Sequence, residues 1–245
     1  MKGLILAGGL ATRLRPLTLV TNKHLLPVYN KPMIYYPLET MAKAGVNEVL
    51  LSTGPDHAGQ FTNLIGDGEE FGLKVYYTIQ RNPKGGIAQG ISLAEEFADN
   101  QKLLVVLGDN IFNFDLKSVV DEFEKVERGA IVFGVHMPTE SRQYGVIEVD
   151  NDGQVISIEE KPENPKSDIA QTGIYMYDNQ VFSRINNLNP SARGELEVTD
   201  LNNLYVRDGI MSCRIIDWWI DAGTSHDELL KANNMVKEKV DTGEL

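Results

Sequence analysis

The sequence predicts an α/β protein with a mostly parallel central sheet flanked by helices and an antiparallel insertion in its second half. Over roughly the first 135 residues, apolar segments alternate with segments of helical period, which is typical of a parallel sheet. Beyond Tyr144 the strand-like segments follow one another around a hairpin signal, which favours antiparallel pairing. The 245 residues suit one large domain or two small ones.

The first strand is expected at Lys2–Ala7, because this segment is apolar on both faces and ends in two glycines. A helix should follow over Pro32–Ala44, with Pro32 at its first position and Gly45 at its C-terminal stop. Asp115 is expected to be the N-cap of a later helix. The other strands of this half are expected at Val46–Ser52, Leu73–Thr78, Leu103–Leu107 and Ala130–Val135, and the other helices at Ala88–Ala98 and Leu116–Val126.

The second half begins with a predicted hairpin. Gly145–Val149 and Val155–Glu159 flank Asn151-Asp152-Gly153, which is a turn signal between two strands. A further strand is expected at Ile169–Tyr177. The remaining elements are two helices at Asn179–Leu188 and Glu197–Arg207, a strand at Cys213–Ile216 and a final amphipathic helix at Ser225–Val240.

The segment after the first strand has the composition of a phosphate-binding loop. Gly8 and Gly9 let the backbone approach a phosphate closely, and the free N–H groups of such a loop bind anions. Arg13 adds a planar set of donors suited to phosphate oxygens, and Arg15 and Lys23 add positive charge. The spacing fits neither the Walker pattern nor the dinucleotide pattern. A tight turn with solvated arginines would also explain the two glycines, so the neighbouring residues decide the interpretation.

Two aspartates are candidate metal ligands. Asp109 follows the buried segment Leu103–Leu107, so it should lie at the carboxyl edge of the sheet, where open α/β sheets bind ligands. Asp221 lies in Trp218–Thr224, beside a glycine turn. Mg²⁺ commonly takes one or two carboxylates and completes its shell with waters and phosphate oxygens. Either aspartate could instead cap the helix that follows it.

The charge balance argues against a polyanionic polymer as a partner. Lys and Arg number 23 and Asp and Glu 35, so the formal net charge is −12, which would repel nucleic acid and anionic membrane surfaces. We expect no membrane span and no signal peptide, because no apolar run has the required length or flanks. Cys213 is the only cysteine, which excludes an internal disulfide and predicts a reducing compartment, the cytoplasm.

Together with the loop, the run from Lys23 to Leu38 (KHLLPVYNKPMIYYPL) closely resembles the sugar-1-phosphate nucleotidyltransferases. The resemblance extends from Met1 to about Lys239 and depends on a long composite signature. It implies a Rossmann-like fold with one nucleotidyltransferase domain over residues 1–245. Within that domain we expect a nucleotide lobe at about 1–135 plus a C-terminal part, and an inserted antiparallel sugar-binding lobe at about 140–215.

The resemblance also implies roles for individual residues. Arg13, Lys23 and Lys161 are the expected catalytic cations, with Lys161 on the sugar phosphate. Asp109 and Asp221 are expected to hold the metal. The nucleotide is expected to contact Leu6, Gly8, Gly9, Arg13, Gln80, Gly86 and Asp109, and the sugar is expected to contact Asn110, Tyr144, Gly145, Glu160, Lys161 and Thr172.

Without the resemblance, two of these groups have ordinary interpretations. Glu160 and Lys161 would be a solvated end of a strand, and Gln80 would be an exposed residue at the end of another. The resemblance instead places Glu160 on sugar hydroxyls. It places Gln80 on the O4 and N3–H edge of a pyrimidine, which a glutamine amide can pair with.

The implied reaction is the transfer of a deoxythymidylyl group from dTTP to glucose-1-phosphate, which yields dTDP-glucose and pyrophosphate. Mg²⁺ is the expected cofactor, and in-line attack on the α-phosphorus needs no covalent enzyme intermediate. The product would lead towards dTDP-deoxysugars such as dTDP-rhamnose for polysaccharide biosynthesis. The alternatives are a uridylyltransferase that uses UTP and a catalytically silent nucleotide-sugar sensor. The family also suggests a homo-oligomer, often a tetramer.

Several positions depart from the family pattern. Ala11 replaces a common glycine in the loop, His24 a common glutamine near the base, and Asn30 a common aspartate. The Lys84–Gly86 loop is longer than in the longer-chain members, which bears on base preference. The sequence ends at Leu245, before their helical extension, so no regulatory site or subunit contact built from that extension is assumed.

Overall fold

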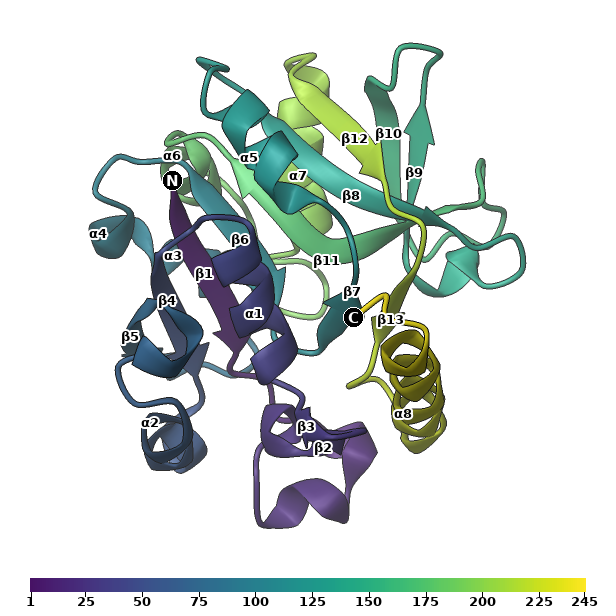
Figure 1. Cartoon of the computed structure of the whole chain (residues 1–245). Coiled ribbons are helices and arrows are strands. Elements are labelled where there is room, and N and C mark those ends of the chain that lie inside the picture. The colour runs from purple at the N-terminus through teal and green to yellow at the C-terminus, as the bar shows by residue number, and fades with distance from the viewer.

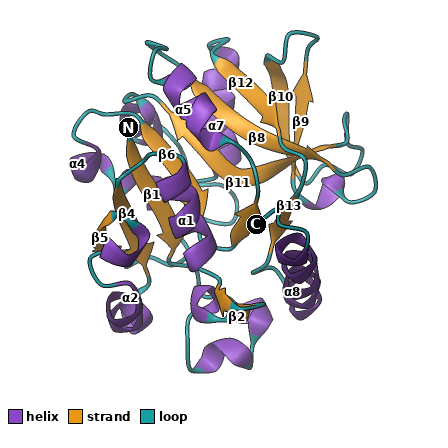
Figure 2. Cartoon of the chain, in the orientation of Figure 1, coloured by secondary structure: helices purple, strands orange, loops and turns teal.

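The computed structural model describes residues 1–245. Its centre is a nine-stranded mixed sheet with helices on both faces (Figure 1). Figure 2 distinguishes the strands of the sheet from the helices that cover it. This architecture confirms the predicted fold class. The main path through the sheet runs β10 (Val155–Glu160), β9 (Gly145–Val149), β11 (Ile169–Tyr177), β6 (Leu103–Leu107), β1 (Lys2–Ala7), β4 (Glu48–Thr53) and β5 (Lys74–Ile79), while β8 (Ala130–His136) and β12 (Met211–Ile215) continue from the other edge of β11.

Strands β1, β4, β5 and β6 are parallel, and β1 lies between β4 and β6. Their carboxyl ends therefore meet at one edge of the sheet. Gly8 follows β1, Gln80 follows β5 and Asp109 lies just past β6, so all three reach this edge. The adjacent side chains of Leu4 and Ile5 are both fully buried although they point to opposite faces, because helices cover the sheet on both sides.

Each face of the sheet has its own apolar core. The first contains Ile5 and the second contains Leu4. The helices of the first face are α1 (Tyr35–Lys43), α2 (Ala58–Ile65) and α5 (Leu116–Phe123), and those of the second are α3 (Gly86–Ser92), α4 (Glu95–Ala98), α6 (Val181–Ile185) and α7 (Val198–Arg207).

Strand β11 joins the two parts of the sheet. All nine of its residues are buried. It pairs antiparallel with β6 and β9 along one edge and with β8 along the other. The β9–β10 hairpin is thereby attached to the parallel strands through a shared neighbour. The predicted antiparallel insertion is present, with the difference that β12 runs parallel to β8.

Two small sheets are absent from the sequence prediction. Strand β2 (Pro27–Val28) pairs with β3 (Lys31–Pro32), and β7 (Asn110–Phe112) pairs with β13 (Trp219–Asp221). The prediction that Pro32 opens a helix is therefore wrong, because Pro32 pairs with Pro27 and α1 begins only at Tyr35.

Other predicted boundaries also shift. The helix expected at Ala88–Ala98 is divided into α3 and α4, and the one expected at Asn179–Leu188 is confined to α6. Short 3-10 helices occur at η1 (Thr12–Leu14), η2 (Leu17–Leu19), η3 (Lys23–Leu25), η4 (Pro55–His57), η5 (Glu69–Phe71) and η6 (Ser141–Gln143).

Helix α8 (His226–Asp241) closes a third core. Its Val236 is buried with Val28 of the β2–β3 hairpin and Ile220 of β13. The Ser225 hydroxyl caps α8 by accepting a hydrogen bond from the Glu228 backbone N–H at 3.1 Å. No helix of the protein combines the length and the apolar character that crossing a membrane requires.

The predicted helix ends are confirmed at two positions. Asp115 caps α5, because its carboxylate accepts a hydrogen bond from the Ser118 backbone N–H at 3.3 Å. Gly45 follows α1 with φ +75°, the left-handed conformation that commonly ends a helix.

Ala11 offers a test of backbone strain. It has φ +48° and ψ +39°, a left-handed conformation that costs a residue with a Cβ atom about 1 kcal/mol. We predict that Ala11→Gly leaves the free energy of unfolding unchanged or raises it by up to about 0.5 kcal/mol, since relief of this strain offsets the greater flexibility of glycine. Urea denaturation would measure the change.

The control is Ala44→Gly, because Ala44 has φ −71° and ψ −8°. The same replacement should lower the stability there by at least about 1 kcal/mol, because Ala44 has an unstrained right-handed conformation and its buried methyl group is also lost. An equal loss at Ala11 and Ala44 would contradict the assignment of strain to Ala11.

Candidate active site

A cavity of about 460 Å³ opens where the parallel strands end. This volume suits a small-molecule ligand. All fifteen residues that the sequence analysis connected with catalysis, nucleotide, sugar or metal line this cavity. They span the chain from Leu6 to Asp221, so the fold collects them from distant segments. Their individual roles remain predictions.

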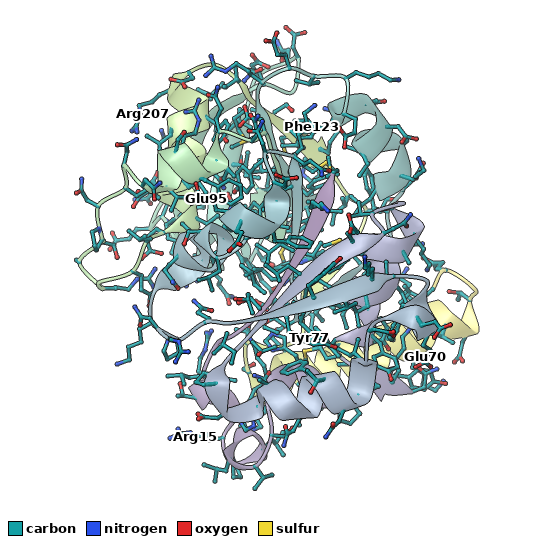
Figure 3. All side chains as sticks on the ribbon, turned by 90° about the vertical axis from the view of Figure 1, so that its left-hand side faces the viewer. Arg15, Glu70, Tyr77, Glu95, Phe123 and Arg207 are labelled. Atoms are coloured by element: carbon teal, nitrogen blue, oxygen red, sulfur yellow. The ribbon has the colours of Figure 1, made fainter.

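Gly8 and Gly9 continue from β1 along the cavity. A Cβ atom on Gly8 would lie 2.3 Å from Gln80 Oε1, so this position has no space for a side chain. Gly9 is exposed and open, which leaves its backbone accessible to a ligand. Arg13 follows in η1 and also lines the cavity. Arg15 does not line it and lies at the periphery of the molecule (Figure 3).

Lys23 and Asp109 form an ion pair inside the cavity, with Lys23 Nζ in contact with Asp109 Oδ2. Their side chains are only 16% and 8% exposed. Burial alone would raise the pKa of Asp109, but the Lys23 ammonium outweighs it and holds this pKa well below its usual range. Burial alone would lower the pKa of Lys23, but Asp109 and Asp221 raise it instead. Both groups are therefore charged at neutral pH.

Asp221 is the second carboxylate at this point. It pairs with Asn110 across the β13–β7 sheet, and this register places it beside Asp109. Burial and the Asp109 carboxylate raise the pKa of Asp221. Because a single ammonium, that of Lys23, faces two carboxylates, negative charge remains in excess where water is scarce.

The two aspartates fit a divalent cation. No group of three His, Cys, Asp or Glu side chains is placed to hold a metal. Mg²⁺ needs no such group, since one or two carboxylates suffice when substrate phosphates and waters complete its octahedron. Asp109 and Asp221 supply this donor set, and a divalent cation would neutralise their excess charge.

Glu160 and Lys161 are consecutive residues that both line the cavity. Successive side chains of a strand point to opposite faces, so a regular strand could not present both. Lys161 follows β10 with φ +46°, and this left-handed turn brings the two side chains to the same site. The Lys161 backbone N–H donates to the Tyr144 carbonyl at 3.0 Å, and the Glu160 carboxylate accepts from the Thr199 hydroxyl at 3.0 Å.

The predicted base-binding segments are fixed by hydrogen bonds. Gln80 Nε2 donates to Gln89 Oε1 at 2.9 Å. Gly86 opens α3 with φ +85°, and a Cβ atom there would lie 2.4 Å from the Leu196 carbonyl oxygen. The Leu196 backbone N–H donates to the Gly85 carbonyl at 2.9 Å. The glycine loop is thus held against the segment that precedes α7.

Some lining residues were given no role by the sequence analysis. Trp219 contacts Tyr144 edge to face, with ring centroids 5.2 Å apart. Arg193 adds a further cation, paired with Glu197 at 2.9 Å, and Thr199 orients Glu160. The charged run from Arg193 to Glu197 was a usable sequence signal for Arg193 and the neighbouring Thr199. The contact of Trp219 depends on a strand pairing that the sequence does not reveal.

A comparison of the chain with known families decides its classification. The family model for nucleotidyl transferases matches residues 2–239. The chain belongs to the nucleotidyl transferase family. This result confirms the family resemblance inferred from the loop and the Lys23–Leu38 run, and it identifies the chain as a member of an enzyme family.

This nucleotidyl transferase has close relatives among characterised proteins. It is 44% identical to the glucose-1-phosphate thymidylyltransferase of Neisseria meningitidis over 241 residues, which cover 97% of this chain and 83% of the relative. It is 43% identical to the glucose-1-phosphate thymidylyltransferase of Mycolicibacterium smegmatis over 242 residues, covering 97% and 82%.

Solved structures agree with the fold of this nucleotidyl transferase. A Bacillus anthracis protein assigned as a glucose-1-phosphate thymidylyltransferase, in complex with a sucrose, is 45% identical and superposes with a TM-score of 0.90 over 96% of this chain and 94% of that one. A UDP-glucose pyrophosphorylase complexed with UDP-glucose gives a TM-score of 0.83 at 23% identity over 97% and 98% of the two chains, which shows the shared fold alone.

His24 is a buried neutral histidine in the cavity of this nucleotidyl transferase. It is 2% exposed, and its Nδ1 lies 2.6 Å from Asn22 Oδ1. Because that amide oxygen can only accept, Nδ1 carries the proton. Burial and the neighbouring Lys23 ammonium lower the pKa of His24 to about 3.

Acid titration tests this environment. In the unfolded chain a histidine has a pKa of about 6.5, so below that pH the unfolded state takes up a proton that folded His24 does not. Stability should therefore fall by about 1.4 kcal/mol per pH unit as the pH decreases from about 6.5 towards 3. We predict that His24→Gln reduces the loss of unfolding free energy between pH 7 and pH 5 by about 2 kcal/mol.

Urea denaturation at the two pH values would measure this difference. The same replacement at His57, outside the cavity, controls for the general loss of an imidazole. Identical pH dependence in the wild type and His24→Gln would contradict the prediction.

Proposed function

We propose that this nucleotidyl transferase transfers a deoxythymidylyl group from dTTP to glucose-1-phosphate, giving dTDP-glucose and pyrophosphate. The observation that carries the proposal is the gathering of three cations, Arg13, Lys23 and Lys161, and two aspartates in one cavity of a protein with a net charge of −12. Such a site suits two anionic substrates and a metal ion. The names of the relatives support dTTP as the nucleotide.

The triphosphate would bind at the carboxyl edge of the parallel strands. Gly8 and Gly9 offer an accessible backbone, and Arg13 and Lys23 place positive charge beside them. The base would reach Gln80, and the remaining proposed nucleotide contacts are Leu6, Gly86 and Asp109. Lys23 already contacts Asp109, so its ammonium is held close to the position where negative charge develops.

The sugar phosphate would bind on the side formed by β9, β10 and β11. Lys161 would hold its phosphate, and Glu160, kept in place by the Thr199 hydroxyl, would accept hydrogen bonds from sugar hydroxyls. The other proposed contacts are Asn110, Tyr144, Gly145 and Thr172. The left-handed conformation of Lys161 allows one short segment to recognise both ends of the molecule.

The reaction is a displacement at phosphorus. An oxygen of the sugar phosphate attacks the α-phosphorus of dTTP in line, the bond from that phosphorus to the bridging oxygen breaks, and pyrophosphate leaves with the electron pair. The attacking phosphate is already an anion, so positioning and charge neutralisation matter more than a general base. Asp109 and Asp221 would hold Mg²⁺, which when bound supplies positive charge at the α-phosphate.

Pyrophosphate release tests activity and base choice together. The assay contains glucose-1-phosphate, Mg²⁺ and one of dTTP, UTP, ATP, CTP or GTP. We predict the highest kcat/KM with dTTP, by about tenfold over UTP. UTP lacks the thymine methyl group, which is worth about 1–3 kcal/mol in a fitted pocket, and carries an additional 2′-hydroxyl. A higher value with UTP would assign a uridylyltransferase, and no release with any of the five would favour a nucleotide-sugar sensor.

Removal of Arg13 should slow the chemical step. We predict that Arg13→Ala lowers kcat by about 10²–10³-fold, the scale of one lost preorganised donor in a transition state. Arg15→Ala is the matched control, because Arg15 does not line the cavity, and it should stay within about twofold of the wild type. Near-native turnover of Arg13→Ala would remove Arg13 from the mechanism.

A further inference from the structure

Asn110 occupies a junction of the fold. It follows Asp109 directly, begins β7 and pairs with Asp221 of β13. Only 1% of its surface is exposed, although it borders the cavity. Asn110 therefore adjoins both residues proposed to hold the metal, and its buried amide must find hydrogen-bond partners within the protein.

The orientation of the Asn110 amide is determined by its neighbours. Asn110 Oδ1 accepts a hydrogen bond from the Gly173 backbone N–H at 2.7 Å and another from Trp219 Nε1 at 2.5 Å. Both partners can only donate, so the amide oxygen must face them. Asn110 Nδ2 consequently points the other way and donates to Asp109 Oδ1 at 3.1 Å. Two protein donors occupy the oxygen, whereas Nδ2 has a second hydrogen that a sugar hydroxyl could accept.

The Asp109 carboxylate is thereby held at both oxygens. Oδ1 accepts from Asn110, and Oδ2 contacts Lys23 Nζ. Gly223 closes the space on a further side, since a Cβ atom there would lie 2.4 Å from Asp109 Oδ2. Rotation of this carboxylate would break at least one of these contacts, so its direction is fixed before any ligand arrives.

The same amide reaches the opposite half of the cavity. Gly173 belongs to β11, and a Cβ atom at this position would lie 2.6 Å from Asn110 Oδ1. Trp219 packs edge to face on Tyr144, one of the proposed sugar contacts. One buried side chain therefore links the wall of the proposed sugar pocket to the proposed metal ligand.

We infer that Asn110, besides the sugar contact proposed above, is a positioning residue that orients the Asp109 carboxylate through Nδ2, anchored by Gly173 and Trp219. The inference rests on the proposed function only in taking Asp109 as a metal ligand. Residues behind a metal ligand commonly change metal affinity or activity by about 10–100-fold when replaced.

Asn110→Asp isolates the contact. An aspartate has the same shape and can still accept from Gly173 and Trp219, but it presents a lone pair instead of a donor to Asp109. We expect kcat to fall by about 10–100-fold, beyond any change in KM for glucose-1-phosphate that loss of the sugar contact would cause. We also expect Mn²⁺, measured by electron paramagnetic resonance of the protein without substrates, to bind at least about fivefold more weakly despite the added negative charge.

Two further variants complete the test. Loss of the hydrogen bond in Asn110→Asp should lower the melting temperature, measured in EDTA. The double variant Asp109→Asn/Asn110→Asp exchanges the donor and the acceptor, so it should recover at least half of that decrease. Asn113→Asp adds the same charge at an exposed position outside the cavity and should leave Mn²⁺ binding unchanged.

The outcomes separate the possible roles. A rise in KM for glucose-1-phosphate with unchanged kcat and unchanged Mn²⁺ binding would confine Asn110 to the sugar contact and overturn the inference. Tighter Mn²⁺ binding in Asn110→Asp would show a role for charge alone, and no recovery in the exchanged variant would remove the hydrogen bond as the cause. If the wild type does not use dTTP, the proposed function fails, but the Mn²⁺ and melting measurements still decide the role of Asn110.

Discussion

Parallel pairing of β1 with β4 and β6 is the constraint on which the site depends. It places the carboxyl ends of the strands at one edge, so the glycine loop and Asp109 line the same cavity although they are far apart in the sequence. The strands must be apolar on both faces to be stable between two layers of helices, and this requirement leaves their ends as the place for polar residues. Core and site therefore have the same origin.

Charge in the cavity is organised by fixed partners. Lys23 and Asp109 neutralise each other where water is largely excluded, and the second carboxylate, Asp221, leaves an excess of one negative charge. Hydrogen bonds from Asn110 and Thr199 hold Asp109 and Glu160 in defined directions. A site of this kind needs little reorganisation when anionic ligands and a cation bind. Preorganised charges and dipoles accelerate phosphoryl transfer because they are already in position when charge develops.

Much of this arrangement could be predicted from the sequence, for identifiable reasons. Strands such as Leu103–Leu107 are apolar runs long enough to be recognised in the sequence. Asp109 could be predicted as a site residue because it follows this strand. Strands β7 and β13 have three residues each, and each forms only by pairing with the other across a long stretch of chain. No local sequence pattern therefore predicts them. The direction of the Asn110 amide depends on that pairing and was equally hidden.

The placement of β13 and α8 bears on how the protein is made. A ribosome releases Lys23 and Asp109 long before Asp221, and α8 must still emerge before Val236 can pack beside Val28. Until then β7 lacks its partner strand and the third core is incomplete. The two proposed metal ligands, Asp109 and Asp221, can therefore come together only after β13 has been made and has paired with β7. A chain that ended before β13 would lack one of the two proposed metal ligands and the partner strand of β7.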